Sequence, residues 1–353
     1  MEHEVRNDCV QNRVGVSLLD CPKLEERMKE NNLEILFLEP VCKHTIWGGT
    51  RLKDEFGCRE EGDDIGELWG ISAHPNGDVT VKNGKYKGMH LSELWEKHRE
   101  LFGDVEGDVF PLLVKIIDAR DDLSIQVHPD DSYAAERENG ALGKTECWYV
   151  IDCPPDASLV LGHNAKDKAE LDELIRQGSW GQLIKRIPVK KGDFLQINPG
   201  TVHALTKGCL ILETQENSDI TYRVYDYDRL QNGRKRELHL EKSRDVIVTP
   251  ARPIEECLVP ASGRDKEVNS LHNLYVCDYY HIYEMEVDGL AQISGLSGFM
   301  LVSVVEGCGE VDGCAVSKGD SFIIPKGYGK AGFKGSMKVI ASTPGQKEQR
   351  KIG

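Results

Sequence analysis

A motif that occurs twice in the 353-residue chain limits the folds open to it. In KKGDFLQINPGTVHAL (190–205) and SKGDSFIIPKGYGKAG (317–332), Lys-Gly-Asp precedes an apolar run, and a turn with Pro and Gly leads to the next run. An internal repeat indicates two copies of one architecture. The first copy delivers His203 where the second has Lys330. We therefore expect two β-barrels of one kind, of which only the first is active.

The rest of the chain also reads as short strands. From Leu36 onward, β-prone runs are broken by Gly, Pro and Asn, and 35 glycines favour many turns. Two helices interrupt them: 90–103, with Ser92 as its cap and Gly103 as its stop, and 165–180, ended by Gly178. The sequence predicts a mainly β protein of two jelly-roll barrels with short helical insertions.

Prolines at 250, 253 and 260 mark the expected domain boundary. We expect an N-terminal extension over 1–34, a catalytic domain with small helical insertions over 35–250, and a degenerate second domain over 251–353. The extension has no strand alternation, although part of it has the composition of a short charged helix.

Charge and apolar content restrict the partners. A net charge of −15 argues against nucleic acid and against anionic membranes, although it leaves room for a local basic pocket. No run is long and apolar enough to span a membrane. The 11 cysteines show no CxxC spacing, and the start of the chain lacks an apolar signal segment, so we expect free thiols in a reducing cytoplasm.

The stretch LSIQVHPDD (123–131) carries the strongest chemical signal. Strand alternation places Ser124, Gln126 and His128 on one face and apolar residues on the other. A hydroxyl, an amide oxygen and an imidazole in one line suit a metal site inside a barrel. Taken alone, the pattern fits an edge strand with a solvated face better.

Further strands offer partners for this polar face. GKTECWYV (143–150) places Lys144 and Glu146 side by side on one face, and His203 lies on the strand after the NPG turn. Gln126, His128, Glu146 and His203 together give a donor set suited to zinc. Each of them is more often structural than functional, but four in a barrel-like strand order are hard to explain that way. Lys115 stands in an apolar run, where a lysine usually reaches out to solvent from a strand end.

Four segments together, LSIQVHPDD, GKTECWYV, NPGTVHAL and ITYR, resemble type I phosphomannose isomerases (mannose-6-phosphate isomerases) of the bicupin superfamily, from about Leu36 to about Thr343. Where longer members of the family carry a larger helical domain, this chain has only the helix near 165–178, so it is similar to the short bacterial branch. The resemblance implies two cupin domains, one zinc ion per chain, and metal ligands at Gln126, His128, Glu146 and His203.

The resemblance also implies roles for the other polar residues. Arg223 and Lys144 would line the catalytic cleft, Ser124 and Lys115 would help bind the sugar phosphate, and Asp219 matches a carboxylate considered for proton transfer. The reaction implied is the interconversion of mannose 6-phosphate and fructose 6-phosphate through a cis-enediol. Asp219 is our choice of base, since metal coordination would lower the basicity of Glu146.

Two alternatives from other classes stay open. Two histidines and one carboxylate also suit an iron-dependent cupin oxygenase, although Gln126 would occupy a position that such an enzyme needs. A non-catalytic sugar-phosphate sensor would keep the pocket without turnover, and the presence of Lys144 and Arg223 argues against it. The partner that we expect is a small sugar phosphate, and we expect a monomer or a weak homodimer.

Overall fold

A computed structural model describes residues 33–264, except 104, and 267–346. Almost all of the expected N-terminal extension, 1–34, lies outside the described residues. Within the described part of the chain, no helix is long and apolar enough to cross a membrane.

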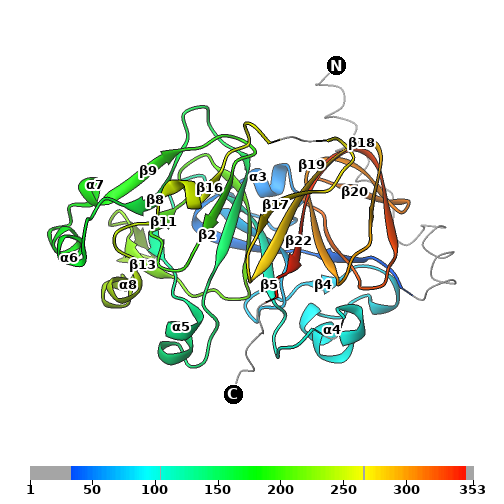
Figure 1. The fold of residues 1–353 in the computed structure, drawn as a ribbon, viewed down its shortest axis with the longest axis horizontal. Helices are drawn as coiled ribbons and strands as arrows, with labels where there is room; N and C mark the ends of the chain where they lie inside the picture. Colours follow the sequence, from blue (N-terminus) through cyan, green and yellow to red (C-terminus); the bar gives the residue numbers. More distant parts are fainter. Residues whose placement is uncertain (1–32, 104, 265–266, 347–353) are drawn as a thin grey trace.

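The fold is mainly β, as expected, and every strand pairing in its three large sheets is antiparallel. One half of the molecule contains a seven-stranded and a five-stranded sheet (Figure 1). The seven-stranded sheet runs, in spatial order, β16 (Leu258–Val259), β10 (Phe194–Ile197), β7 (Glu146–Asp152), β12 (Leu210–Glu216), β5 (Leu112–Asp118), β3 (Ile65–Ile71) and β2 (Val41–Gly49). The five-stranded sheet runs β13 (Tyr222–Tyr225), β6 (Ile125–Val127), β11 (His203–Ala204), β8 (Ser158–His163) and β9 (Ile184–Pro188).

The other half contains an eight-stranded sheet that includes two strands from near the start of the described chain. Its members are β17 (His272–Val276), β18 (Tyr280–Ser294), β22 (Lys330–Pro344), β19 (Met300–Val311), β21 (Ser321–Ile324), β1 (Leu36–Glu39) and β4 (Thr80–Val81), with β20 (Cys314–Ser317) paired to β19. Thus β1 joins the C-terminal sheet, while β16, beyond residue 250, joins the first half. Strand pairing therefore joins residues on opposite sides of the expected boundary near residue 250. The division into domains stays a prediction.

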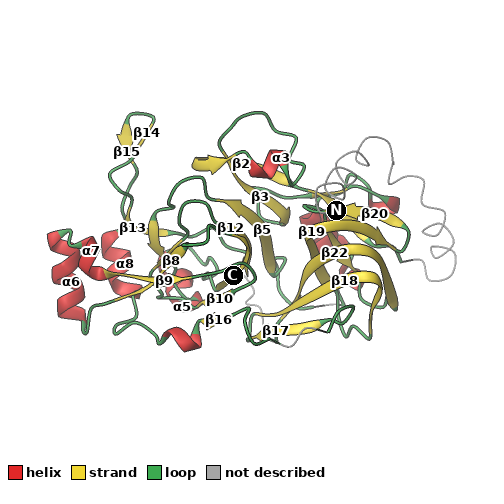
Figure 2. Ribbon diagram, turned by 90° about the horizontal axis from the view of Figure 1, so that it is seen from above, coloured by secondary structure: helices red, strands yellow, loops and turns green. Residues whose placement is uncertain are grey.

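The helices are short and lie at the periphery. They are α3 (Arg51–Asp54), α4 (Leu91–Lys97), α5 (Asp131–Arg137), α6 (Lys168–Gln177), α7 (Trp180–Leu183) and α8 (Leu240–Val246), with 3-10 turns η1 (Gly84–Tyr86), η2 (Arg99–Leu101) and η3 (Ile254–Glu256). Figure 2 shows α6, α7 and α8 together at one end, and the small hairpin β14 (Leu230–Gln231) to β15 (Arg234–Lys235) standing away from the body.

The predicted helix ends are partly confirmed. Gly178 ends α6 in the left-handed conformation that favours glycine, at a φ of 65°. Ser92 is not the cap of α4, because the helix begins at Leu91 and His90 takes the cap position. The Ser92 hydroxyl instead contacts Asp78, at 2.5 Å.

The repeated motif forms the same turn in both halves. Asp193 accepts a hydrogen bond from the backbone N–H of Lys190, and Asp320 accepts one from that of Ser317, each at 2.8 Å. The glycine before each aspartate has a positive φ, and the next strand, β10 or β21, follows directly. In both copies the aspartate side chain accepts a hydrogen bond from the backbone three residues earlier, which stabilises the turn and explains why the motif is repeated.

The expectation of free thiols was wrong for two of the cysteines. Cys42 and Cys58 are not free thiols but form a disulfide, with their Cα atoms 6.4 Å apart. The sheet brings β2 beside the segment after α3, a proximity that cysteine spacing does not encode.

Candidate metal centre and active-site pocket

The strand β6 lies in the middle of its sheet and is not an edge strand. In register, Gln126 stands opposite His203 of β11 on one side and opposite Arg223 of β13 on the other. Ser124 and His128 are buried, at 4% and 1% exposure. The low exposure of these two side chains shows that the polar face points into the protein.

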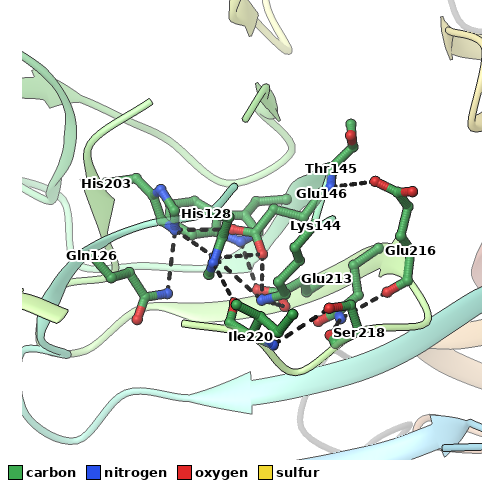
Figure 3. A network of polar contacts seen from close by, with 12 residues as sticks. Gln126, His128, Lys144, Thr145, Glu146, His203, Glu213, Glu216, Ser218 and Ile220 are labelled. Atoms are coloured by element: carbon green, nitrogen blue, oxygen red, sulfur yellow. Dashed lines mark hydrogen bonds and ion pairs between the residues drawn. The ribbon is translucent and has the colours of Figure 1, made fainter. Parts of the chain in front are cut away.

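Three of the four predicted ligands converge (Figure 3). The Nε2 atoms of His128 and His203 lie 3.1 Å apart. Glu146, at the start of β7 in the other sheet, places Oε2 at 3.4 Å from His128 Nε2 and Oε1 at 3.2 Å from His203 Nε2. Among the described residues these three form the cluster of His, Cys, Asp and Glu whose ligand atoms lie within 4.8 Å of one another.

Backbone carbonyls fix both imidazole rings. The Nδ1 of His128 is 2.8 Å from the carbonyl oxygen of Ile220, and that of His203 is 2.8 Å from the carbonyl of Thr201. A proton on Nδ1 leaves Nε2 free to bind a cation, which is the usual arrangement behind metal-binding histidines. Burial, reinforced by the charge of Lys144, lowers the pKa of His128 to about 3, and burial likewise lowers the pKa of His203. Both rings are therefore neutral near pH 7.

The donor set fits a divalent cation. Both carboxylate oxygens of Glu146 are buried. Beside the ammonium of Lys144, they face the Nε2 atoms of the two neutral imidazoles. Two neutral imidazoles and a carboxylate that converge in this way are a donor set typical of zinc sites. The amide Nε2 of Gln126 lies 3.2 Å from His203 Nε2, and half a turn of the amide brings its oxygen to the same place. Gln126 thus supplies a fourth donor.

A pocket of about 400 Å³ opens above this cluster. The other predicted site residues line it together: Lys115, Ser124, Gln126, Lys144, Asp219 and Arg223. Lys144 links the pocket to the cluster, with its Nζ 2.7 Å from Glu146 Oε2 and 3.4 Å from His128 Nε2. The structure therefore gathers all nine predicted residues at one site.

Glu213 is a site residue that the sequence analysis missed. Its Oε1 lies 3.1 Å from Lys115 Nζ and 3.4 Å from Lys144 Nζ, and its Oε2 accepts a hydrogen bond from the indole of Trp148 at 2.7 Å. On β12 it faces Lys115 on one side and Trp148 on the other, in register. A lone carboxylate after the apolar run LIL was the available signal.

Lys115 does not reach out to solvent as its local pattern suggested. Its side chain is 10% exposed, and Glu67 adds a second carboxylate at 3.6 Å. Burial alone would lower the pKa of Lys115, but the charges of Glu213, Glu67 and Glu146 outweigh it and raise that pKa. Lys115 is thus a buried, permanently charged cation between strands.

Asp219 and Arg223 occupy the more open side. The Asp219 carboxylate lies 3.6 Å from His74 and accepts a hydrogen bond of 2.5 Å from the Asn76 amide, with its side chain 45% exposed. Arg223 donates to the backbone carbonyl of Glu237 at 2.8 Å. Asp219 is therefore the pocket carboxylate without a lysine contact among the described residues.

The sequence matches two models of known protein families. The model of the phosphomannose isomerase type I catalytic domain matches residues 35–151, and that of the mannose-6-phosphate isomerase cupin domain matches 270–344. A mannose-6-phosphate isomerase of Bacillus subtilis is 48% identical over 314 residues, 88% of this chain and 98% of that protein. One from Streptococcus mutans is 46% identical over the same shares of each chain.

A comparison with solved structures points to the same class of enzyme. The crystal structure of the mannose 6-phosphate isomerase from B. subtilis superposes with a TM-score of 0.79 at 44% identity, over 88% of this chain and all of that one. The protein is a cupin enzyme with a buried His-Glu-His cluster beneath a polar pocket. It belongs to the type I phosphomannose isomerase family, which confirms the family and the class of enzyme expected from the sequence.

Proposed function

We propose that the chain is a zinc-dependent isomerase that interconverts mannose 6-phosphate and fructose 6-phosphate through a cis-enediol. One observation carries the proposal: two neutral imidazoles and one buried carboxylate converge at the floor of a pocket in which Lys144 bridges that cluster to the cavity. The relatives named above, which bear the name of this activity, support the same substrate.

Gln126, His128, Glu146 and His203 would hold the zinc ion. When bound there, zinc supplies a Lewis acid that polarises the substrate oxygens at C1 and C2. The protein contributes fixed geometry, since carbonyl contacts orient both imidazoles before any cation binds.

Lys144 and Arg223 supply positive charge to the reacting oxygens. An enediolate spreads negative charge over two oxygens, and fixed cations in a partly dry pocket stabilise that charge strongly. Lys144 is 4% exposed and contacts Glu146 of the cluster. Its ammonium group can therefore bind the same substrate oxygen that approaches the cluster. Arg223 stands opposite Gln126 in the sheet, on the other side of the same pocket.

Asp219 is the proposed base that moves the proton between C2 and C1. A base must keep a free lone pair, and a carboxylate held by ammonium groups is a weak one. Glu146 and Glu213 each contact Lys144, whereas Asp219 contacts an amide and an imidazole. Ser124 and Lys115, which line the same pocket, are proposed to bind the sugar phosphate.

A chelator-sensitive isomerase assay tests the proposal. Purified protein should convert mannose 6-phosphate to fructose 6-phosphate, lose the activity with a chelator and regain it with zinc. His203→Ala should abolish both zinc binding and turnover. His163→Ala is the matched control, because His163 is equally buried on the neighbouring strand β8 but contacts the carbonyl of Val248. Bound iron with oxygen consumption, or substrate binding without product, would overturn the proposal.

A further inference from the structure

A single carboxylate beside the pocket holds two arginines. Asp226, 4% exposed just after β13, accepts hydrogen bonds from Arg236 at Nε (2.7 Å) and Nη2 (2.5 Å). It also accepts one from Nη2 of Arg229 at 2.5 Å. Two guanidinium groups on one carboxylate leave a net positive charge. The hydrogen bonds also lock the Arg236 fork in one orientation.

Arg236 and Arg223 both line the pocket, but Arg229 does not. Arg223 has a buried Nε without a hydrogen-bond partner, and none of the ion pairs in the described chain involves it. Burial first, and then the nearby charge of Arg236, lower the pKa of Arg223. Two guanidinium groups that line one pocket repel each other, and a bound anion would relieve that repulsion.

The two lysines that line the pocket are already compensated. Lys115 lies within 3.6 Å of two carboxylates, and Lys144 lies 2.7 Å from Glu146. The uncompensated positive charge of the pocket is therefore carried by its arginines. A phosphate monoester carries nearly two negative charges at pH 7 and needs such charge.

We propose that Arg236 binds the phosphate group of the substrate and that Asp226 is its positioning residue. The inference rests on the proposed function and adds a contact to those of Ser124 and Lys115. Asp226 takes Nε and Nη2 of Arg236, and Nη1 has no hydrogen-bond partner among the described residues. The β14–β15 hairpin, which stands out from the end of β13 in Figure 2, leads directly into Arg236, and its Gln231 also lines the pocket. The hairpin thus presents a recognition group for phosphate.

Arg236→Gln compared with Arg229→Gln tests this role. Both changes remove one arginine from Asp226, but only the first removes a pocket cation. We expect Arg236→Gln to raise KM for mannose 6-phosphate and the inhibition constant of inorganic phosphate by about 10- to 100-fold. The kcat should stay within about threefold. Arg229→Gln should leave both constants within about threefold, since it acts on neither substrate nor pocket.

The outcomes separate the two proposals. If the wild-type chain does not isomerise mannose 6-phosphate, the proposed function fails, yet calorimetric binding of inorganic phosphate still tests Arg236. If Arg236→Gln leaves phosphate binding unchanged, or if Arg229→Gln weakens it equally, the role of Arg236 is wrong. Should Arg236→Gln fail to fold, Arg236→Lys keeps the charge without the planar fork. That variant should weaken phosphate binding by about fivefold or more, and unchanged binding would overturn the role.

Discussion

The ammonium group of Lys144 lies 2.7 Å from Oε2 of Glu146, and both side chains are almost completely buried. The same ammonium lies 3.4 Å from Glu213 Oε1, so one cation serves two carboxylates that come from neighbouring strands. This arrangement joins the candidate metal centre to the pocket. A change at Lys144 therefore affects both Glu146 and Glu213.

Replacing Lys144 with methionine should lower kcat strongly while zinc stays bound. The change removes a fixed cation beside the reacting oxygens, and such groups contribute on the order of 100- to 1,000-fold to the rate. Steady-state kinetics and metal analysis of the same preparation check this. Loss of zinc in parallel with activity would mean that Lys144 supports the ligand Glu146 instead of the reaction.

Asp219→Asn should reduce kcat by about 100- to 10,000-fold, because the amide cannot accept the proton from C2 or C1. KM and zinc content should change little, since Asp219 lies outside the ligand cluster. Exchange of the C2 proton with deuterated water, followed by NMR, reports the proton transfer directly. Near-normal exchange would assign the base to another residue.

Glu213→Gln should destabilise the fold near neutral pH and leave it less sensitive to alkaline pH than the wild type. In the folded wild type the pKa of Lys115 is raised, so the stability that its charge contributes is fully present below its unfolded pKa of about 10.4 and is lost as pH rises through the folded pKa. Without Glu213 the folded pKa moves toward or below the unfolded pKa, so less stability remains to be lost on the alkaline side. Urea unfolding between pH 7 and 11 should show a free energy of unfolding lower than that of the wild type by about 3 kcal/mol at pH 7, and a difference that narrows as pH rises above 10.

Glu67→Gln is the control for this prediction. Glu67 lies farther from Lys115, at 3.6 Å against 3.1 Å, and is more exposed, so its removal should have a smaller effect in the same direction. Equal alkaline profiles for the Glu213 variant and the wild type would show that Lys115 does not depend on Glu213.

The Cys42–Cys58 disulfide should stabilise the strand that carries one side of the pocket. Closing a loop with a sequence separation of 16 is worth about 3 kcal/mol in the chain-entropy model. Cys42→Ser combined with Cys58→Ser should therefore lower the free energy of unfolding by about that amount. Peptide mapping under non-reducing conditions identifies the bond, and recovery of both cysteines as alkylated thiols would contradict it.

The sequence by itself determined which side chains share a face. Period-two alternation put Ser124, Gln126 and His128 together, and the repeated Lys-Gly-Asp turn predicted two related halves. Alternation is a local property of an extended backbone, so it can be read from neighbouring residues. Later strands supplied Glu146 and His203 as partners for this face, and the family resemblance separated Ser124 from the ligands as a phosphate contact.

Only the tertiary structure decided how distant strands meet. The register of β12 between β5 and β7 places Glu213 against Lys115 and Lys144, and the loops of Thr201 and Ile220 supply the carbonyls that orient the histidines. It also moved β1 into the C-terminal sheet and paired Cys42 with Cys58. These contacts join residues far apart in the chain, and sheet packing, which has no local period, selects them.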